Sequence, residues 1–363
     1  MRPTSSSFRR CPAVVAESET RQRPTRPSVT GEPSASRKAS SDPISGVDVG
    51  RREVLRWLAA APVAAGTAGA WRTGSTASAV EPFARSGPPR FRLGVAAYSL
   101  RQEFGYQKGR RKEPVGRDQP LDMIGFLDDC VRWGVEAAEL TSYFFQPGPD
   151  GFPTDDRLRT VRREAFLRGV AIVGTAIGNN FTVGPGPRLQ QEIADAKRWI
   201  RKASVLGAPH IRFFAGTADE LAESPTRLDE AVQAIRECAT VASEHGIFLG
   251  VENHGRLSAD QVLAIMERID SPWVGVNLDT GNFVSETPYD DLKRCAPYAV
   301  NVQVKANMKS PSGERYPADF DRIADILRDA NYQGFVVLEF EEEDSREQIP
   351  RFLDQLRQAF GVS

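Results

Sequence analysis

Short apolar runs alternate with longer amphipathic stretches along the chain from residue 90 onward. Each short run is apolar at both odd and even positions, which is typical of a parallel strand that is covered on both faces. The strands predicted in this way are Phe91–Ser99, Ala137–Thr141, Ala171–Ala176, His210–Ala215, Ile247–Glu252, Val274–Asp279, Ala299–Lys305 and Phe335–Phe340.

The stretches between these runs carry apolar residues at three- and four-residue spacing, which predicts amphipathic helices. These are Leu121–Trp133, Arg157–Arg168, Leu189–Val205, Arg227–Ser243, Ala259–Ile269, Tyr289–Ala296, Phe320–Ala330 and Gln348–Phe360. A left-handed backbone residue often ends a helix and favours glycine. We expect that conformation at Gly134, Gly169, Gly207, Gly246 and Gly334.

Eight strands and eight helices in strict alternation predict a (β/α)₈ TIM barrel, formed as a single domain by residues 90–363. The alternative is a doubly wound open sheet. Such a sheet would carry a glycine-rich phosphate-binding loop after its first strand. The sequence there is Ala97-Tyr98-Ser99-Leu100, so the pattern favours the barrel.

Four successive strands in the second half of the chain end on an oxygen-bearing side chain. These residues are Glu252, Asp279, Gln303 and Glu339. Because α/β barrels place their chemistry at the C-terminal ends of the strands, we expect the four side chains to meet at one mouth of the barrel.

A divalent metal ion is the cofactor that such a set predicts. Three carboxylates close together in a partly buried cleft repel one another, and a divalent cation removes that repulsion. The set offers hard oxygens and no thiolate, which favours Mg²⁺ or Mn²⁺ over zinc. Any one of these residues taken alone could instead cap a helix or pair with an arginine, whereas four in register favour one metal site.

Several runs resemble those of the sugar phosphate isomerase/epimerase family, the xylose isomerase-like barrels. The runs are LGVENHG, VGVNLDTGN, VQVK and GFVVLEFE around the four strand ends, with LGVAAYSLR and HIRFFAGT earlier in the chain. The resemblance covers residues 91–360 and implies one divalent metal held by Glu252, Asp279, the position of Gln303 and Glu339. Relatives more often have histidine at Gln303 and an acidic residue at Ala306, so this sequence departs at both positions.

The resemblance also implies a reaction, namely isomerisation or epimerisation of a sugar or sugar phosphate. The proton next to a carbonyl is removed, and the resulting ene-diolate carries negative charge on oxygen. By the resemblance, Glu252 and Glu339 form the acid/base pair. The family resemblance is specific for the superfamily and leaves the individual reaction open.

Four further residues are candidates for contact with the substrate. Lys305 shares a strand face with Gln303, so it points inward and could bind a substrate oxygen or neutralise the carboxylates. Arg212 needs a partner inside a barrel and could pair with Glu139 or Glu252, or hold a substrate anion. His254 directly follows the strand that ends at Glu252. Glu139 ends the second predicted strand.

The first 79 residues differ in composition from the rest. They hold 12 of the 47 Lys and Arg residues and 6 of the 48 Asp and Glu residues, so a basic leader precedes an acidic body. Residues 1–50 are rich in Ser, Pro and Arg, which predicts a disordered leader. An acidic body disfavours nucleic acid as the partner.

An export signal is the hypothesis for residues 51–79. Arg51-Arg52 followed by the mild apolar run Trp57–Ala70 resembles a twin-arginine signal, which predicts an exported, periplasmic or extracellular protein that meets the twin-arginine translocation machinery. The run is too short and too broken by Gly and Pro to span a membrane. Outside the leader the odd number of cysteines, Cys130, Cys238 and Cys295, predicts no disulfide framework.

Three classes of function compete. The first is the metal-dependent isomerase or epimerase, with a dehydratase or lyase as a close variant. The second is a phosphodiesterase of the endonuclease IV type, which shares the barrel but needs many histidines, and the chain has three. The third is a non-catalytic exported sugar-binding barrel. The oligomeric state stays open.

Overall fold

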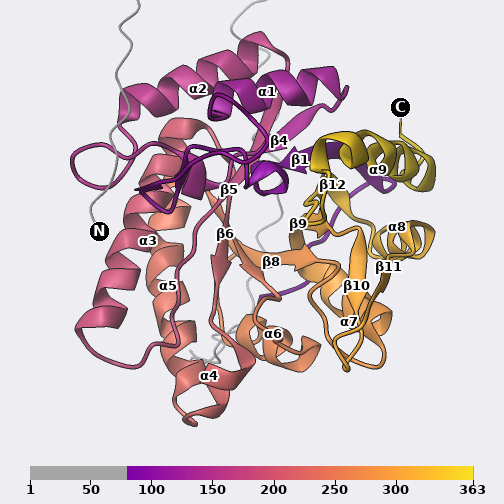
Figure 1. Cartoon of the computed structure of the whole chain (residues 1–363). Helices are drawn as coiled ribbons and strands as arrows, with labels where there is room; N and C mark the ends of the chain where they lie inside the picture. Colours follow the sequence, from indigo (N-terminus) through magenta and orange to yellow (C-terminus); the bar gives the residue numbers. More distant parts are fainter. Residues whose placement is uncertain (1–79, 363) are drawn as a thin grey trace, which may run out of the picture. The chain divides into compact units, whose positions relative to one another are not determined.

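A computed structural model describes residues 80–362, which form the barrel and the segment leading into it (Figure 1). The predicted disordered leader (residues 1–50) and the predicted twin-arginine segment (residues 51–79) lie outside the described residues.

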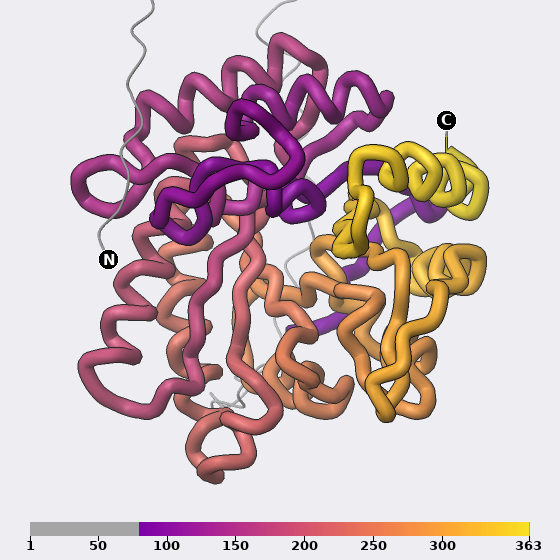
Figure 2. Tube along the Cα trace, viewed as in Figure 1, coloured from indigo at the N-terminus to yellow at the C-terminus, as the bar shows by residue number. Residues whose placement is uncertain are grey.

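Eight parallel strands close into a barrel, as the sequence predicts. Each strand pairs with two neighbours in the order β1-β12-β9-β8-β7-β6-β5-β4, and β1 pairs with both β12 and β4 to complete the circle. Figure 2 shows the first strand beside segments from the end of the chain. The strands are β1 (Arg90–Ala96), β4 (Ala137–Glu139), β5 (Ala171–Ala176), β6 (His210–Phe214), β7 (Phe248–Glu252), β8 (Val274–Asp279), β9 (Ala299–Val304) and β12 (Gln333–Leu338).

The predicted helices are confirmed to within a few residues at their ends. They are α1 (Met123–Arg132), α2 (Asp155–Leu167), α3 (Pro187–Leu206), α5 (Arg227–His245), α6 (Ala259–Met266), α7 (Pro288–Cys295), α8 (Phe320–Asp329) and α9 (Ser345–Phe360). Several begin at side-chain caps, such as Ser258 and Gln261, which cap α6 reciprocally.

The predicted glycine positions at helix ends are right in four cases and wrong in one. Gly134, Gly169, Gly207 and Gly246 all have positive φ directly after their helices. Gly334 instead lies within β12, and Asn331 takes the left-handed position after α8. Asparagine tolerates that conformation better than other side chains, which explains the exchange.

The loops at the C-terminal ends of the strands carry small elements that the periodicity did not predict. The loop after β1 holds a 3₁₀ turn (Ala97–Leu100) and the hairpin of β2 (Tyr106–Gln107) and β3 (Arg110–Arg111). The loop after β9 holds the hairpin of β10 (Asn307–Lys309) and β11 (Arg315–Pro317), and the loop after β6 holds α4 (Ala218–Ala222). Further 3₁₀ turns lie at Ser142–Phe144 and Ala296–Tyr298.

The barrel strands bury an apolar cluster and also several polar side chains. Small apolar side chains from β1, β4, β5 and β12 pack together: Ala96, Ala137, Val173 and Val337. The strands β6, β8 and β9 instead bury polar side chains: His210, Arg212, Asn277, Asn301 and Gln303. The buried carboxylates Glu139, Glu252 and Asp279 lie at the C-terminal ends of β4, β7 and β8.

Cys130, Cys238 and Cys295 are buried free thiols, as the odd number of cysteines predicts. Within residues 80–362, no helix combines the length and the apolar character that crossing a bilayer requires.

Candidate active site at the C-terminal mouth of the barrel

Glu252, at the end of β7, is held by three side chains. Its Oε2 lies 2.8 Å from Nε of Arg212, and both side chains are almost fully buried. Its Oε1 accepts a 2.8 Å hydrogen bond from Asn282 and lies 3.3 Å from Nδ1 of His254. Burial by itself would raise the pKa of Glu252, but Arg212 and His254 outweigh it, so the pKa lies below its ordinary value. Glu252 is therefore an ionised carboxylate.

Arg212, on β6, links this carboxylate to the neighbouring loop. Its Nη1 donates a 3.2 Å hydrogen bond to the carbonyl oxygen of Ile177, and its guanidinium lies 4.0 Å from the ring centroid of Phe214. The ring of Phe214 in turn stacks on His254, with 4.1 Å between centroids. Burial lowers the pKa of Arg212, but Glu252 and the other nearby acids raise it by more. The net pKa therefore lies above its ordinary value, and Arg212 stays charged.

Asp279, at the end of β8, is placed by its neighbours' backbone and by Asn253. The side chain of Asn253 accepts from the backbone N–H of Asp279 and donates to its carbonyl oxygen, both at 2.8 Å. Oδ1 of Asp279 accepts a 2.9 Å hydrogen bond from the N–H of Gly281. Oδ2 is buried without any hydrogen-bond partner. Burial raises the pKa of Asp279. The charge of Lys305 lowers this pKa and the charge of Glu252 raises it again, so that the pKa lies well above its ordinary value.

Lys305, one residue beyond β9, reaches three carboxylates. Its Nζ lies 3.5 Å from Oδ2 of Asp279 and 3.0 Å from Oε2 of Glu341, and it donates a hydrogen bond to Oε2 of Glu339. Its backbone N–H is fixed by a 3.1 Å hydrogen bond to Oγ1 of Thr280. Burial lowers the pKa of Lys305, yet the carboxylates raise it well above its ordinary value, so the ammonium form persists.

Gln303 joins a row of side-chain amides that crosses the barrel. Asn301 donates to Asn277 at 2.9 Å, Asn277 donates to Oε1 of Gln303 at 2.6 Å, and Nε2 of Gln303 donates to Oε2 of Glu139 at 2.9 Å. Thr141 donates to the other oxygen of Glu139 at 3.4 Å. Burial, followed by Glu339, raises the pKa of Glu139 to about 7.

The structure brings every sequence-predicted site residue to this end of the barrel. The contacts above join these residues in three groups: Arg212 with Glu252 and His254, Lys305 with Asp279 and Glu339, and Gln303 with Glu139.

Sequence reasoning missed three residues of the site, Asn277, Asn282 and Glu341. Asn277 interrupts an apolar run, Asn282 lies within VGVNLDTGN, and Glu341 falls two residues after Glu339. Those features were the signals that could have found them.

Residues 127–358, more than half of the chain, match the family described as xylose isomerase-like TIM barrel. The chain belongs to this family. A curated relative, 3-oxo-isoapionate decarboxylase from Pectobacterium atrosepticum, is 31% identical over 107 residues, which are 29% of this chain and 38% of the relative. The match therefore spans well under half of that relative's length.

Solved structures of low sequence identity share the fold of this xylose isomerase-like barrel. D-psicose 3-epimerase with D-tagatose from Clostridium cellulolyticum H10 has a TM-score of 0.58 at 16% identity, covering 74% of this chain and 99% of that chain. 3-keto-D-glucoside 4-epimerase from E. coli has a TM-score of 0.54 at 15% identity, covering 74% and 100%. A family member from Mycobacterium smegmatis in complex with magnesium has a TM-score of 0.54 at 19% identity, covering 74% and 97%.

The donor chemistry of this xylose isomerase-like site fits a divalent cation. The site holds five carboxyl groups, those of Glu139, Glu252, Asp279, Glu339 and Glu341, and two cations, Arg212 and Lys305. Oδ2 of Asp279 is buried and has no hydrogen-bond partner. A void of about 10 Å³ lies beside Lys305 and Glu339. In the part of the chain that the structure describes, no three acidic, His or Cys side chains form a ready-made metal site. The ammonium of Lys305 lies between Asp279 and Glu339 instead.

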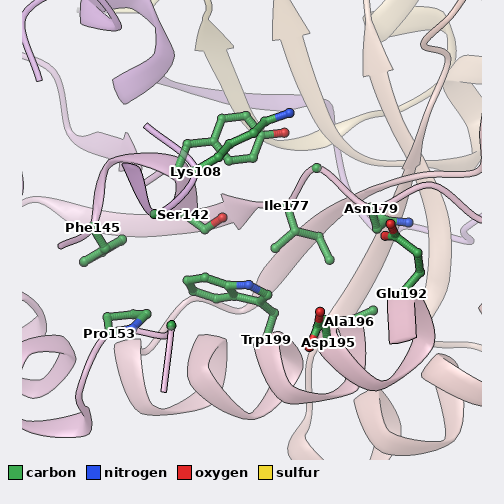
Figure 3. A pocket seen from close by; sticks show the side chains of 14 residues that line it. Lys108, Ser142, Phe145, Pro153, Ile177, Asn179, Glu192, Asp195, Ala196 and Trp199 are labelled. Atoms are coloured by element: carbon green, nitrogen blue, oxygen red, sulfur yellow. The ribbon is translucent and has the colours of Figure 1, made fainter. Parts of the chain in front are cut away.

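A larger cavity of about 240 Å³ adjoins the mouth (Figure 3). Trp199, Glu192 and Asp195 project into it from α3, and Lys108 lies on the side away from that helix. Ile177 lines the cavity and its carbonyl oxygen accepts the hydrogen bond from Arg212. The cavity thus shares a wall with the pair of Arg212 and Glu252, and its lining of aromatic, hydroxyl, amide and charged groups suits a hydroxyl-rich ligand.

Proposed function

We propose that this protein is a divalent-metal-dependent enzyme that isomerises or epimerises a sugar or a sugar phosphate. The observation that carries the proposal is the convergence of Glu252, Asp279 and Glu339 from three barrel strands around the buried cations Arg212 and Lys305. Membership of the xylose isomerase-like family and the epimerases among its structural neighbours support the same class of reaction.

Glu252 would remove the proton from the carbon next to the substrate's carbonyl group. A general base must be ionised at the working pH, and the lowered pKa of Glu252 meets that requirement. Arg212 holds the carboxylate in one orientation and Asn282 holds its other oxygen. His254 lies beside Glu252 with about half of its side chain exposed, so it can also contact the substrate.

Glu339 would return the proton on the opposite side. Its Oε2 accepts a hydrogen bond from Lys305, which orients the carboxylate towards the inside of the barrel before the metal is bound. Proton removal leaves an ene-diolate with negative charge on oxygen. The ammonium of Lys305 can donate to such an oxygen. Gln303 fixes Glu139 by its hydrogen bond, and Glu139 faces the same interior.

Glu252, Asp279, Gln303 and Glu339 would hold the metal, for which Mg²⁺ or Mn²⁺ suits hard oxygen ligands better than zinc. When bound, a divalent ion supplies electrostatic stabilisation to the negative charge that develops on the substrate's oxygens. The cavity beside Trp199 would accommodate the part of the substrate that lies away from the reacting carbon.

A lyase is the second candidate, and the curated relative favours it. That relative is named a decarboxylase and matches this chain at 31% identity over 107 residues. A decarboxylation at a carbon next to a carbonyl also passes through a negatively charged oxygen, so the same cations and carboxylates would serve. A sugar-binding barrel without catalysis would bind substrate and release it unchanged.

Deuterium exchange tests the reaction. The protein is incubated in D₂O with Mn²⁺ and a panel of ketoses, including D-psicose, D-fructose and D-tagatose, and each sugar is analysed by NMR. We expect deuterium at the carbon next to the carbonyl, and we expect Glu252→Gln and Glu339→Gln to abolish its appearance. Glu343→Gln, in an exposed side chain beside the site, is the matched control. Release of CO₂ from a 3-oxo sugar acid without exchange of the ketoses would favour the lyase.

We also propose that the protein is exported through the twin-arginine route, on the strength of the sequence of residues 51–79. A folded barrel with buried thiols and no disulfide among its described residues is compatible with that route.

A further inference from the structure

Lys305 contacts carboxylates of two kinds. Asp279 and Glu339 are deeply buried, with side chains 0% and 7% exposed, and they belong to the metal-ligand candidates. Glu341 is 33% exposed and lies three residues beyond the end of β12, outside that set. Its Oε2 is 3.0 Å from Nζ of Lys305, so the ammonium already touches a carboxylate at the edge of the site.

An ammonium and a divalent ion compete for the same oxygens here. Oδ2 of Asp279 has Lys305 at 3.5 Å and no hydrogen-bond partner, so it is the atom that an incoming ion would find free. Two cations within a few ångströms of each other in a buried site repel strongly. Binding of the ion therefore requires the ammonium to move away from Asp279 and Glu339.

Glu341 offers the displaced ammonium of Lys305 a carboxylate at the edge of the site. The backbone of Lys305 is fixed by Thr280, but its four-carbon side chain is flexible. Glu341 is already within contact, and its backbone carbonyl oxygen is held by a 2.8 Å hydrogen bond from Nη2 of Arg101. With its backbone anchored in this way, Glu341 can keep the ammonium at the edge of the site through its carboxylate.

We propose that Lys305 fills the cation site before the metal is bound, and that Glu341 is the positioning residue that holds the Lys305 ammonium once the metal takes Asp279 and Glu339. This inference rests on the metal dependence in the proposed function. It assigns a role to Glu341, and it makes the affinity for the metal depend on where Lys305 is held.

Mn²⁺ binding to four purified proteins tests the inference without any substrate. Dissociation constants are measured by calorimetry for the wild type, Lys305→Met, Glu341→Gln and the double variant. We expect Lys305→Met to bind Mn²⁺ roughly 10-fold more tightly and Glu341→Gln roughly 10-fold more weakly, the usual size of coupling between sites. Because Glu341 acts through Lys305, the double variant should bind as tightly as Lys305→Met alone.

The double variant separates positioning from simple charge. If Glu341 attracted the ion only through its charge, Glu341→Gln would weaken binding equally with Lys305 or Met at position 305, and that result would overturn the proposal. An unchanged or weaker Mn²⁺ affinity in Lys305→Met would overturn it as well. Failure of every variant and the wild type to bind Mn²⁺ or Mg²⁺ would instead reject the metal dependence in the proposed function.

Two further measurements guard against trivial causes. Lys309→Met removes an exposed lysine from β10 that acts on Glu341 only through its charge, and it should leave the Mn²⁺ affinity nearly unchanged. Melting temperatures with and without Mn²⁺ should show a larger stabilisation by the ion in Lys305→Met than in the wild type. If Lys305→Met does not fold, Lys305→Gln retains a neutral hydrogen-bond donor and replaces it in both the single and the double variant.

Discussion

Gln303 donates a hydrogen bond from Nε2 to Oε2 of Glu139, 2.9 Å away, although the two residues are 164 positions apart in the chain. This contact ties β9 to β4 across the inside of the barrel, while Oε1 of Gln303 accepts from Asn277 on β8. Both ends of the amide are therefore engaged in the interior. Whether the same amide oxygen also serves the metal stays a prediction.

Replacing Gln303 by alanine should destabilise the barrel by about 3 kcal/mol, because it leaves Oε2 of Glu139 and Nδ2 of Asn277 without a buried hydrogen-bond partner. Chemical denaturation of the wild type and the variant measures the difference. Asn301→Ala is the control, since Asn301 ends the row and its loss leaves only one buried acceptor unpaired. Equal losses in the two variants would contradict the special position of Gln303.

Replacing Gln303 by histidine tests its role towards the metal. Imidazole donates a lone pair more strongly than an amide oxygen does, so Gln303→His should raise metal affinity, most of all for the later transition metals. Metal titrations and thermal melts are compared for the same protein. A large loss of melting temperature with unchanged titration curves would show that residue 303 is not a ligand.

The imidazole of His210 occupies a slot that two glycines leave open. A Cβ at Gly174 would lie 2.6 Å from Nδ1 of His210, and a Cβ at Gly250 would clash with Nε2 and lie 3.0 Å from Cβ of Asn277. Gly250→Ala should therefore cost about 1–3 kcal/mol of unfolding free energy through overpacking. In a protein that already carries His210→Ala, Gly250→Ala should lower the free energy of unfolding by much less. Additive losses of unfolding free energy would contradict the packing explanation.

His210 should also make stability fall in acid. Burial, with Arg212 as the second cause, lowers the pKa of His210 to about 3, whereas an unfolded imidazole titrates near pH ~6.5. Between these values the unfolded chain binds the extra proton, so lowering the pH through this window favours unfolding, by up to about 1.4 kcal/mol per pH unit. Above pH ~6.5 the contribution of His210 to the free energy of unfolding no longer changes with pH.

Denaturation at several pH values checks this slope. His210→Phe keeps a ring of similar size without a titrating group, so its stability should fall less steeply between pH ~6.5 and ~3. His245→Phe removes an exposed histidine and should leave the slope unchanged. An identical slope in the wild type and His210→Phe would rule out His210 as its source.

The fold was predictable because the local pattern of apolar and polar residues indicates each strand and each helix. Runs such as Val274–Asp279 are buried along their whole length, as their apolar residues at both odd and even positions indicate. Inward residues of one strand alternate, so Gln303 and Lys305 were expected on one face. The strand-end rule then brought Glu252, Asp279 and Glu339 to the same mouth.

The partners within the site were not predictable in the same way. The contact of Gln303 with Glu139 depends on how β9 and β4 face each other across the barrel, which no local pattern encodes. The contact of Glu341 with Lys305 is made from the loop after β12, which the strand-end rule does not place. The left-handed residue at Asn331, in place of the expected Gly334, shows that a tolerant side chain can replace glycine where the helix end requires it.

Changing Arg51 and Arg52 to lysine should keep the protein in the cytoplasm of a host with a twin-arginine pathway, because the signal depends on the arginine pair. Fractionation of cells followed by immunoblotting measures the distribution. Arg9 and Arg10 form a second pair in the leader, and changing both to lysine should leave export intact. Equal export of both double variants would contradict the proposed signal.

The metal content of Asp279→Ala tests the central claim most directly. Wild-type protein and variant are dialysed against Mn²⁺ and their bound metal is counted, with circular dichroism to confirm that both are folded. Because Oδ2 of Asp279 is buried and has no hydrogen-bond partner, the variant should lose the ion while the barrel remains intact. The proposal predicts one ion per wild-type chain and none in Asp279→Ala. Equal metal content in both proteins, or none in the wild type, would contradict it.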